Sequence, residues 1–578
     1  MHPGTAAFAR SATLLAGLLA WGSAALAQEA AGTDVGVLDP AAAAKPFRKV
    51  DAFSPYAGWN YPMRVFWGDQ HVHTGWSADA GAFGCTLGPE EGVKAASEMI
   101  RAQSTGKISP IMKDPKFARS IWAKNTAIVE KYNEPGRFTA FIGYEWTSNA
   151  GGGDNLHRNV IYRGGKAQAD QVLPLTTFDS ENPEDLWKWM EAWEKKTGGR
   201  LLAIPHNGNL SNGRMFVLTT FLGNPLTRAW AETRAKWEPL YEATQIKGDG
   251  ETHPSLSTTD EFAAYEKWDK GNLNLVPKQP GMIQYEYARR ALQNGLALEQ
   301  QLGVNPFKFG LVSGTDTHTG LSTPEEENFF GKHTGVEPSA DRWKHLVIQF
   351  QDRKVEGWEM AAAGWTGVWA TENTRESLWD AMKRRETYST TGPRMTVRFF
   401  GGFDFVASDV QSRLPAEAGY TKGVPMGGDL RAAPAGRAPT FLVYALKDPI
   451  GGNLDRIQSV KGWLDAKGGV QEKVYDVAWS DGRKPGRDGK LPAVGSSVDV
   501  ANATWTNTIG DPELGAVWKD PSFDPKLRAF YYARAIQIPT PRWTAYDAKR
   551  FGIQLPPEVP MVTQERAYTS PIWYTPGA

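Results

Sequence analysis

Two pairs of metal-ligating side chains lie at the ends of two apolar segments that are far apart in the sequence. They are His71 and His73 after the segment 64–67, and Asp316 and His318 after the segment 309–312. In a strand, residues two positions apart point to the same face, so each pair presents its two groups together. Imidazole nitrogens and carboxylate oxygens arranged in this way suit zinc, manganese or iron. Hydrogen-bonded polar residues near a sheet edge are the alternative for one pair alone, but two matched pairs favour a metal centre.

Three further histidine or acidic side chains occupy comparable positions beside apolar segments. Glu145 follows the segment 138–142, His206 follows 201–203, and His157 lies just before 159–162. Acids and histidines that gather at strand ends are typical of an active site on an α/β barrel. Each one alone is more often a buried polar residue with hydrogen-bond partners. Their common placement beside the two pairs favours a role at the same site.

The order of apolar segments predicts an α/β domain followed by a β-rich domain. From Tyr61 the predicted strands are 64–67, 138–143, 159–162, 201–204, 243–246 and 309–313, and the predicted helices are 89–102, 115–132, 183–197 and 285–302. After about Gly392 the pattern changes to strands joined by Gly, Pro and Asp turns, at 395–400, 440–444, 459–464, 473–478, 497–500 and 530–536. We therefore expect an α/β domain over 61–392 with an appended β-sandwich-like domain over 393–578.

The N-terminus has the features of a secretory signal peptide. Arg10 supplies a positive charge, residues 11–24 form a short apolar segment, and Ala25-Leu26-Ala27 fits the small-x-small cleavage rule. Cleavage after Ala27 and an N-terminal arm over 28–60 are expected, with the mature protein in a bacterial periplasm. An uncleaved anchor is the alternative. No later segment is long and apolar enough to predict a membrane span.

The composition excludes some classes of function. Lys and Arg total 64, as do Asp and Glu, and no basic run is present, so the chain has no electrostatic footprint for nucleic acid. Cys85 is the only cysteine, so an internal disulfide is excluded. Stability must come from buried area, which a chain of 578 residues supplies readily.

At the level of ordered motifs the chain resembles the PHP (polymerase and histidinol phosphatase) superfamily. The motifs are His71-Val72-His73, Asp79, Gly143-x-Glu145, His157, Ile204-Pro205-His206 and Asp316-x-His318. More narrowly, the blocks 143–149, 206–213, 246–254 and 314–320 resemble an exported bacterial branch that is catalogued as a domain of unknown function. The resemblance extends from about Tyr61 to the C-terminus.

The resemblance implies a distorted (β/α)7 barrel, two to three divalent metal ions (Zn, Mn or Fe) and a small-molecule substrate, a phosphate ester. By motif, the first metal would be held by His71, His73, Glu145 and Asp316, the second by Glu145, His157 and His206, and the third by Asp79 and His318. Such metals lower the pKa of bound water and neutralise phosphoryl oxygens.

Four further side chains are candidates for the substrate pocket. Arg158 is the expected phosphate clamp, and it joins Glu145 and Asp316 as a catalytic candidate; a solvated arginine is the alternative. Asn207, Asn209 and Asn212 either line the pocket or only supply turn conformations.

The chain departs from the family between the first histidine pair and Glu145. Residues 90–132 are predicted to form two helices, without the strand and Asp-His motif that normally complete the third site. His253 is the only nearby histidine that could substitute, but its loop is better suited to substrate contact. Three hypotheses follow: a phosphoesterase, a metal-dependent hydrolase of another bond such as an amide or lactone, and a degenerate binding protein whose metals only stabilise the fold.

Overall fold

The structure is a computed structural model that describes residues 61–75, 77, 80, 85, 114–334 and 337–577. The expected signal peptide and N-terminal arm, Asp79 and the helix predicted over 89–102 lie outside the described residues. The part of the chain that the structure describes contains no helix long and apolar enough to cross a membrane.

Two short sheets of three strands each lie between Gly143 and Ser313. In the first, β2 (Gly143–Trp146), β4 (Arg158–Tyr162) and β5 (Leu201–Pro205) pair antiparallel. In the second, β6 (Leu240–Gln245) pairs in parallel with β8 (Gly310–Ser313) and antiparallel with the short β7 (Gly248–Asp249). A bridge between His206 and Glu242 connects the end of β5 to β6. The two sheets therefore meet where the predicted ligands are concentrated.

The mixed α/β architecture is confirmed, but the described strands lie in open sheets and do not close a barrel. Their directions are also more varied than a (β/α)7 barrel requires. Only the segment 147–157, with the short α6 (Ala150–Gly153), connects β2 to β4. A parallel pair needs a crossover of a dozen or more residues, usually a helix, so this short connection produces an antiparallel pair.

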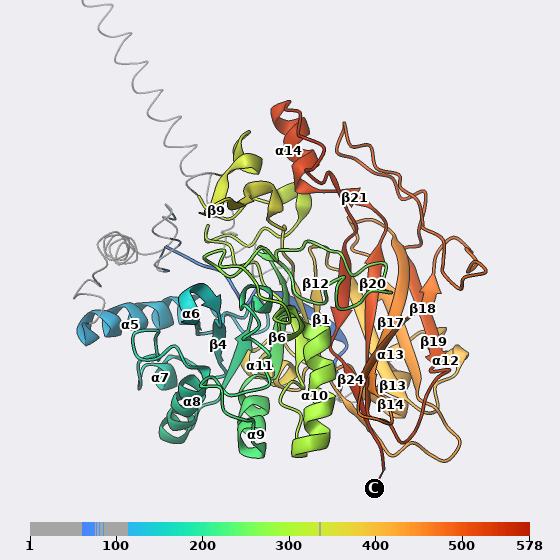
Figure 1. The fold of residues 1–578 in the computed structure, drawn as a ribbon, viewed down its shortest axis with the longest axis horizontal. Helices are drawn as coiled ribbons and strands as arrows, with labels where there is room; N and C mark the ends of the chain where they lie inside the picture. The colour runs from blue at the N-terminus through green and yellow to red at the C-terminus, as the bar shows by residue number, and fades with distance from the viewer. Residues whose placement is uncertain are drawn as a thin grey trace, which may run out of the picture. The chain divides into compact units, whose positions relative to one another are not determined.

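Helices cover the outer side of these sheets. They are α5 (Pro115–Tyr132), α8 (Pro183–Thr197), α9 (Arg228–Trp237) and α10 (Ala288–Leu302), and Figure 1 shows α8, α9 and α10 next to one another. The ends of α8 follow from its sequence: Asn182 accepts a hydrogen bond from the Glu184 amide, and Gly198 closes the helix at φ +68°. Its buried face packs on β4 and β5 through Leu186, Trp187, Met190 and Trp193.

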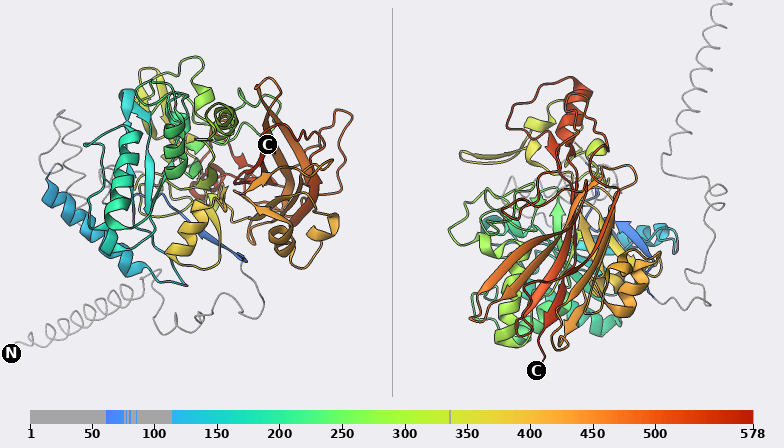
Figure 2. Two further views of the ribbon diagram at one scale, coloured as in Figure 1. Left: turned by 90° about the horizontal axis from the view of Figure 1, so that it is seen from below. Right: turned by 90° about the vertical axis from the view of Figure 1, so that its right-hand side faces the viewer.

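A large sheet joins the two halves of the chain. Its order is β1 (Arg64–Gly68), β11 (Thr366–Ala370), β12 (Thr387–Thr390), β23 (Arg566–Thr569), β20 (Ala529–Gln537), β17 (Leu454–Leu464) and β18 (Val470–Trp479), with β24 (Ile572–Thr575) and β15 (Asp429–Arg431) attached at β20. The first three strands precede position 392 and the others follow it. Figure 2 shows the long strands of the second half side by side.

A second sheet packs on this one, as expected for a β-sandwich. It contains β14 (Gly423–Pro425), β13 (Thr396–Gly402), β16 (Thr440–Leu446) and β19 (Glu513–Lys519). Between the two sheets lies a core that includes Tyr388, Phe399, Phe441, Tyr531 and Ala567. Because Tyr388 belongs to β12, this core extends across the expected boundary at 392, and the described residues on both sides of that boundary belong to one compact unit.

Candidate metal centre

The two ligand pairs found in the sequence lie side by side. A parallel bridge joins Val72 to Thr317, with the His73 amide 2.9 Å from the Thr317 carbonyl oxygen and the Asp316 amide 2.7 Å from the His71 carbonyl oxygen. The Asp69 carboxylate connects the segment after β1 to the segment after β8, because it accepts hydrogen bonds from the backbone amides of His71 and Thr315. The ends of β1 and β8 therefore hold their ligands against each other.

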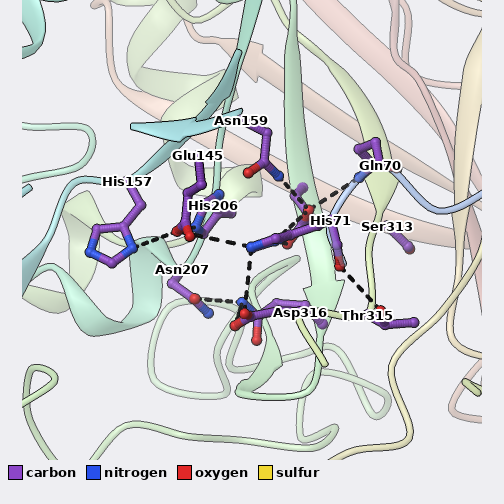
Figure 3. A network of polar contacts seen from close by, with 12 residues as sticks. Gln70, His71, Glu145, His157, Asn159, His206, Asn207, Ser313, Thr315 and Asp316 are labelled. Atoms are coloured by element: carbon purple, nitrogen blue, oxygen red, sulfur yellow. Dashed lines mark hydrogen bonds and ion pairs between the residues drawn. The ribbon is translucent and has the colours of Figure 1, made fainter. Parts of the chain in front are cut away.

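Four side chains, His71, His73, Glu145 and Asp316, approach one another at the first candidate position, and Figure 3 shows His71, Glu145 and Asp316. The Nε2 atoms of His71 and His73 are 3.2 Å apart, and they lie 3.4 and 3.1 Å from Asp316 Oδ1. Glu145 Oε2 lies 3.2 Å from His73 Nε2. Ligand atoms at ~2.1 Å from a tetrahedral ion are about 3.4 Å from one another. His71, His73 and Asp316 therefore have ligand atoms at distances that suit a divalent ion, and Glu145 contacts this group through His73.

Glu145 connects the first position to a second one. Its Oε1 atom lies 2.7 Å from His157 Nδ1 and 2.9 Å from His206 Nε2, while its Oε2 atom faces the first position. Glu145, His157 and His206 have ligand atoms close enough to hold one ion, as do His71, His73 and Asp316. Glu145 thus contacts His157 and His206 with one carboxylate oxygen and His73 with the other.

Glu242 belongs to the centre and was missed in the sequence. Its two carboxylate oxygens lie 3.0 and 3.2 Å from His71 Nδ1, and Gln70 and Asn159 donate hydrogen bonds to its Oε2 atom. The predicted strand 243–246 began just after Glu242, whereas β6 begins at Leu240 and buries it. The feature of the sequence that could have identified Glu242 is its position as an acidic residue inside an apolar strand.

Burial sets the protonation of the histidines. It lowers the pKa of His71 well below its ordinary value and that of His206 to about 3, so both are neutral imidazoles. Burial opposes ionisation of Glu145, but positive charge at His157 and His73 outweighs it and holds the pKa of Glu145 well below its usual range. For Glu242, burial dominates and raises the pKa to about 7. Neutral imidazoles with an ionised bridging carboxylate are the forms that bind a divalent cation.

Two lysines contact the Asp316 carboxylate, and neither was singled out in the sequence. Lys247 forms an ion pair with Oδ2, and Lys332 Nζ lies 3.2 Å from Oδ1. Gln245 also donates to Oδ2, at 2.8 Å. Asp316 is almost fully buried, so its negative charge is compensated by ammonium groups as well as by the groups of the first position.

Arg158 is not brought to the centre, which corrects its expected role as a phosphate clamp. Its Nε atom donates to Glu238 Oε1 at 3.0 Å, and the residue is 1% exposed. The next residue on β4, Asn159, contacts Glu242, so Arg158 points to the opposite face of the strand. Arg158 instead forms a buried ion-pair cluster with Glu238 and Arg234.

The three asparagines have different places. Asn207 accepts a hydrogen bond from the same Gln245 amide group that donates to Asp316, so it lies beside the centre. Asn209 and Asn212 donate to backbone carbonyl oxygens, of Trp268 at 2.9 Å and Val276 at 3.1 Å, and thus support loops.

The residues expected at the third metal site do not form a candidate ligand group among the described residues. Asp79 lies outside the described residues. The His318 ring stacks on the His73 ring at 3.9 Å between centroids, but among the described residues no candidate ligand group includes His318. His253 contacts Asp269 and Ser255 instead of the predicted ligands.

The sequence matches the family described as protein of unknown function (DUF3604) over residues 60–109 and 91–576. Because the match covers most of the chain, the chain belongs to this family. No curated protein and no solved structure was found to match it.

Proposed function

We propose that this DUF3604 chain is a metal-dependent hydrolase of phosphate esters that acts outside the cytoplasm. The observation that carries the proposal is the place of Glu145, whose two carboxylate oxygens face two separate sets of histidines. A structural ion needs only one closed set of ligands, whereas two neighbouring positions that share a carboxylate are typical of hydrolytic centres.

Metal ions bound at the two positions would activate a water molecule and neutralise charge that develops on the substrate. The side chains of the protein have separate tasks in such a site. Glu145 and Asp316 supply the negative charge that would hold the ions, and His71, His73, His157 and His206 supply nitrogen ligands. Glu242 accepts the Nδ1 proton of His71 and thereby turns Nε2 toward the first position.

The lysines favour an anionic substrate over a neutral amide or lactone. The Lys247 side chain is 15% exposed, so its ammonium group lies at the edge of the centre where a phosphate oxygen can be bound. Lysine binds phosphate as a point charge, and it supplies the positive charge that Arg158 does not bring to this site. The proposed substrate class is therefore a small phosphate ester.

We also propose that the sheets around the centre are a distorted form of the PHP barrel. The bridge from His206 to Glu242 and the bridge from Val72 to Thr317 link successive strand ends around the ligands. The Oγ atoms of Ser313 and Ser389 also contact each other between β8 and β12. An experimental structure of the metal-loaded protein tests whether these strands surround the ions.

The function is tested by metal content per chain together with hydrolysis of p-nitrophenyl phosphate and its bis ester. Purification without chelator is expected to yield bound metal and turnover, both of which fall in Glu145→Ala and His71→Ala. Glu191→Ala, on the exposed side of α8, is the matched control and should change neither.

Other outcomes distinguish the competing hypotheses. Bound metal with hydrolysis of amides or lactones but of neither phosphate ester would contradict the proposed substrate class. Folded protein that binds no metal and hydrolyses none of these compounds would exclude a metal-dependent enzyme and leave the binding protein.

A further inference from the structure

A cavity lies between β4, the first turns of α8, the loop 214–223 and α9. Its volume is about 130 Å³, close to the ~150 Å³ of a protein cavity that holds a benzene molecule. Its lining includes three aromatic and three cationic side chains, which are Trp187, Phe221 and Trp230, and Arg158, Arg214 and Arg234. Aromatic walls with a few placed guanidinium groups are suited to a small organic anion.

The cavity is separate from the candidate metal centre, because the two lie on opposite faces of β4. Neighbouring residues of a strand point to opposite faces. Asn159 contacts Glu242 in the centre, whereas Arg158 lines the cavity. Among the described residues, no candidate metal ligand belongs to the cavity lining. A molecule in the cavity would therefore not be a ligand of the proposed ions.

Two buried arginines share one carboxylate at this cavity. Arg158 Nε lies 3.0 Å from Glu238 Oε1, and Arg234 Nε lies 3.0 Å from Glu238 Oε2. Arg158, Arg234 and Glu238 are 1%, 4% and 3% exposed. Two guanidinium groups and one carboxylate leave an excess of one positive charge, which is costly in a buried cluster. Burial lowers the pKa of Arg234 to about 10, although the attraction of Glu238 opposes this.

Each of the two arginines also has a nitrogen without a protein partner. Arg158 Nη1 donates to the Leu156 carbonyl oxygen, and Arg234 Nη2 donates to the Met215 carbonyl oxygen at 2.9 Å. Within the part of the chain that the structure describes, neither Arg158 Nη2 nor Arg234 Nη1 has a hydrogen-bond acceptor. Because both side chains are buried and line the cavity, these N–H groups are available to a molecule that enters it.

Glu184, the only acid among the described residues of the lining, does not supply the missing negative charge. Its Oε1 atom accepts hydrogen bonds from the Phe221 amide at 2.9 Å and from Trp230 Nε1 at 3.0 Å. It also lies in the first turn of α8, where the helix dipole stabilises a carboxylate. Arg214 lies 3.6 Å from Asp154, and its side chain is 30% exposed. It adds a third guanidinium group at the more exposed side of the cavity.

We propose that this cavity binds a small organic carboxylate, with its oxygens at Arg158 and Arg234 and its apolar part beside Trp187, Phe221 and Trp230. A carboxylate carries one negative charge, which offsets the excess of the arginine cluster, and its two oxygens match guanidinium donors. The aromatic side chains favour an organic ligand over an inorganic ion. This site goes beyond the proposed function and does not rest on it.

The test is calorimetric titration of the full-length chain with sodium benzoate, which combines a carboxylate with a ring of suitable size. We expect one benzoate per chain, bound at least about 10-fold more tightly than benzamide, which has a similar shape and no charge. No binding of benzoate at millimolar concentrations, or equal binding of benzoate and benzamide, would overturn the inference.

Because carboxylates also bind metal ions, the titration is repeated after removal of metal with EDTA. Benzoate should bind equally well to the metal-free protein, and inorganic phosphate should bind to it more weakly than benzoate. Loss of benzoate binding from folded metal-free protein would place the ligand at the metal centre and overturn the inference. Tighter binding of phosphate would contradict the carboxylate class.

Two variants locate the binding site. Arg234→Met removes one guanidinium group and should weaken benzoate binding at least about 10-fold, whereas Arg228→Met, at an exposed position of the same helix, should not. Val217→Trp should fill the cavity and leave both buried arginines in place, and Leu218→Trp, at the exposed next position, is its control. Unchanged affinity in folded Arg234→Met or folded Val217→Trp would overturn the inference.

Circular dichroism shows which variants are folded, and if neither variant folds, the comparison of benzoate with benzamide in wild type decides. The result is also distinguishable from a failure of the proposed function. Protein that binds benzoate in the metal-free state but hydrolyses no phosphate ester would contradict the function alone. Active metal-loaded protein that binds no benzoate would contradict the inference alone.

Discussion

At the scale of single residues, the sequence identified the side chains that repeat a spacing and missed those that do not. His71, His73, Asp316, Glu145, His157 and His206 were all predicted from their places beside apolar segments, and the structure brings them together. Glu242 was missed because the predicted strand began one residue after it, and Lys332 because no local pattern reveals its contact with Asp316. Arg158 was assigned wrongly, because its partner Glu238 lies 80 residues away in the sequence.

The contact between Glu242 and His71 predicts a specific loss of metal affinity. Glu242→Gln removes the carboxylate charge at nearly constant volume, so the His71 ring should be less firmly oriented and less basic. Replacement of such a partner costs about 10–100-fold in metal affinity. Competition with a chelator should show this loss for one of the two ions, with no change in Glu191→Gln. Equal affinities in wild type and Glu242→Gln would show that His71 does not need this contact.

Asp249 predicts how stability depends on pH. Burial raises its pKa to about 7, against about 4 in an unfolded chain. The folded state therefore retains a proton that the unfolded state loses, and stability declines as the pH rises from about 4 to 7. The decline amounts to about 4 kcal/mol and is complete above pH 7.

Asp249→Asn should remove this pH dependence. The Asn oxygen can still accept from the Glu251 amide, and its NH₂ group can donate to Thr244 Oγ1. The Tm of Asp249→Asn minus the Tm of wild type, measured by thermal unfolding, should be larger at pH 8 than at pH 5. The same difference in Tm at both pH values would contradict the assigned pKa.

At the scale of helices and strands, the ends were predicted best where capping residues mark them. The predictions over 115–132 and 183–197 agree with α5 and α8 at both ends, because each has Pro at its first position and an Asx residue before it. Strand β2 lies later than predicted, at Gly143–Trp146, and 497–500 forms only an isolated bridge at Asp499. A short connection indicates an antiparallel neighbour, as for β2 and β4, but strands distant in the sequence carry no such indication of their pairing.

Gly314, at the end of β8, lets this strand lie close to Glu242 and His71, and we expect metal binding to require this close approach. A Cβ atom there would lie 2.5 Å from Glu242 Oε2 and 2.7 Å from His71 Cβ. Gly314→Ala should therefore displace both side chains and reduce metal affinity by at least about 10-fold. Gly68→Ala, at the end of β1, is the matched control because nothing lies within 4 Å of its Cβ position. Equal metal affinities in the two variants would contradict this explanation.

At the scale of the whole molecule, the two halves share both a sheet and buried ion pairs. Arg534 on β20 lies 2.6 Å from Asp260 and 3.4 Å from Glu251, and Glu251 also pairs with Arg289 on α10. All four side chains are buried, so removal of one partner would leave an uncompensated charge. The change near Gly392 to short apolar segments joined by Gly, Pro and Asp turns correctly indicated a strand-rich region. It did not indicate that β12 and β23 would pair across this position.

The shared sheet predicts that the halves do not fold separately. A fragment of residues 61–392 would expose the edge of β12 and the apolar side chains that face the second sheet, including Tyr388 and Trp369. We expect this fragment to be insoluble or unfolded by circular dichroism, and the full chain to unfold in one calorimetric transition. A soluble, folded fragment or two well-separated transitions would show that the halves are independent.

The pairing of β1 with β11 also determines when the centre can form. Arg64 is opposite Ala370 in this pair, and β11 is the only neighbour of β1 in the described sheet. During synthesis, His71 and His73 emerge early but have no fixed position until the ribosome has passed residue 370. A metal ion at the proposed centre would then bind only after this part of the chain has folded. The compartment in which the chain folds would therefore determine which ion is available to it.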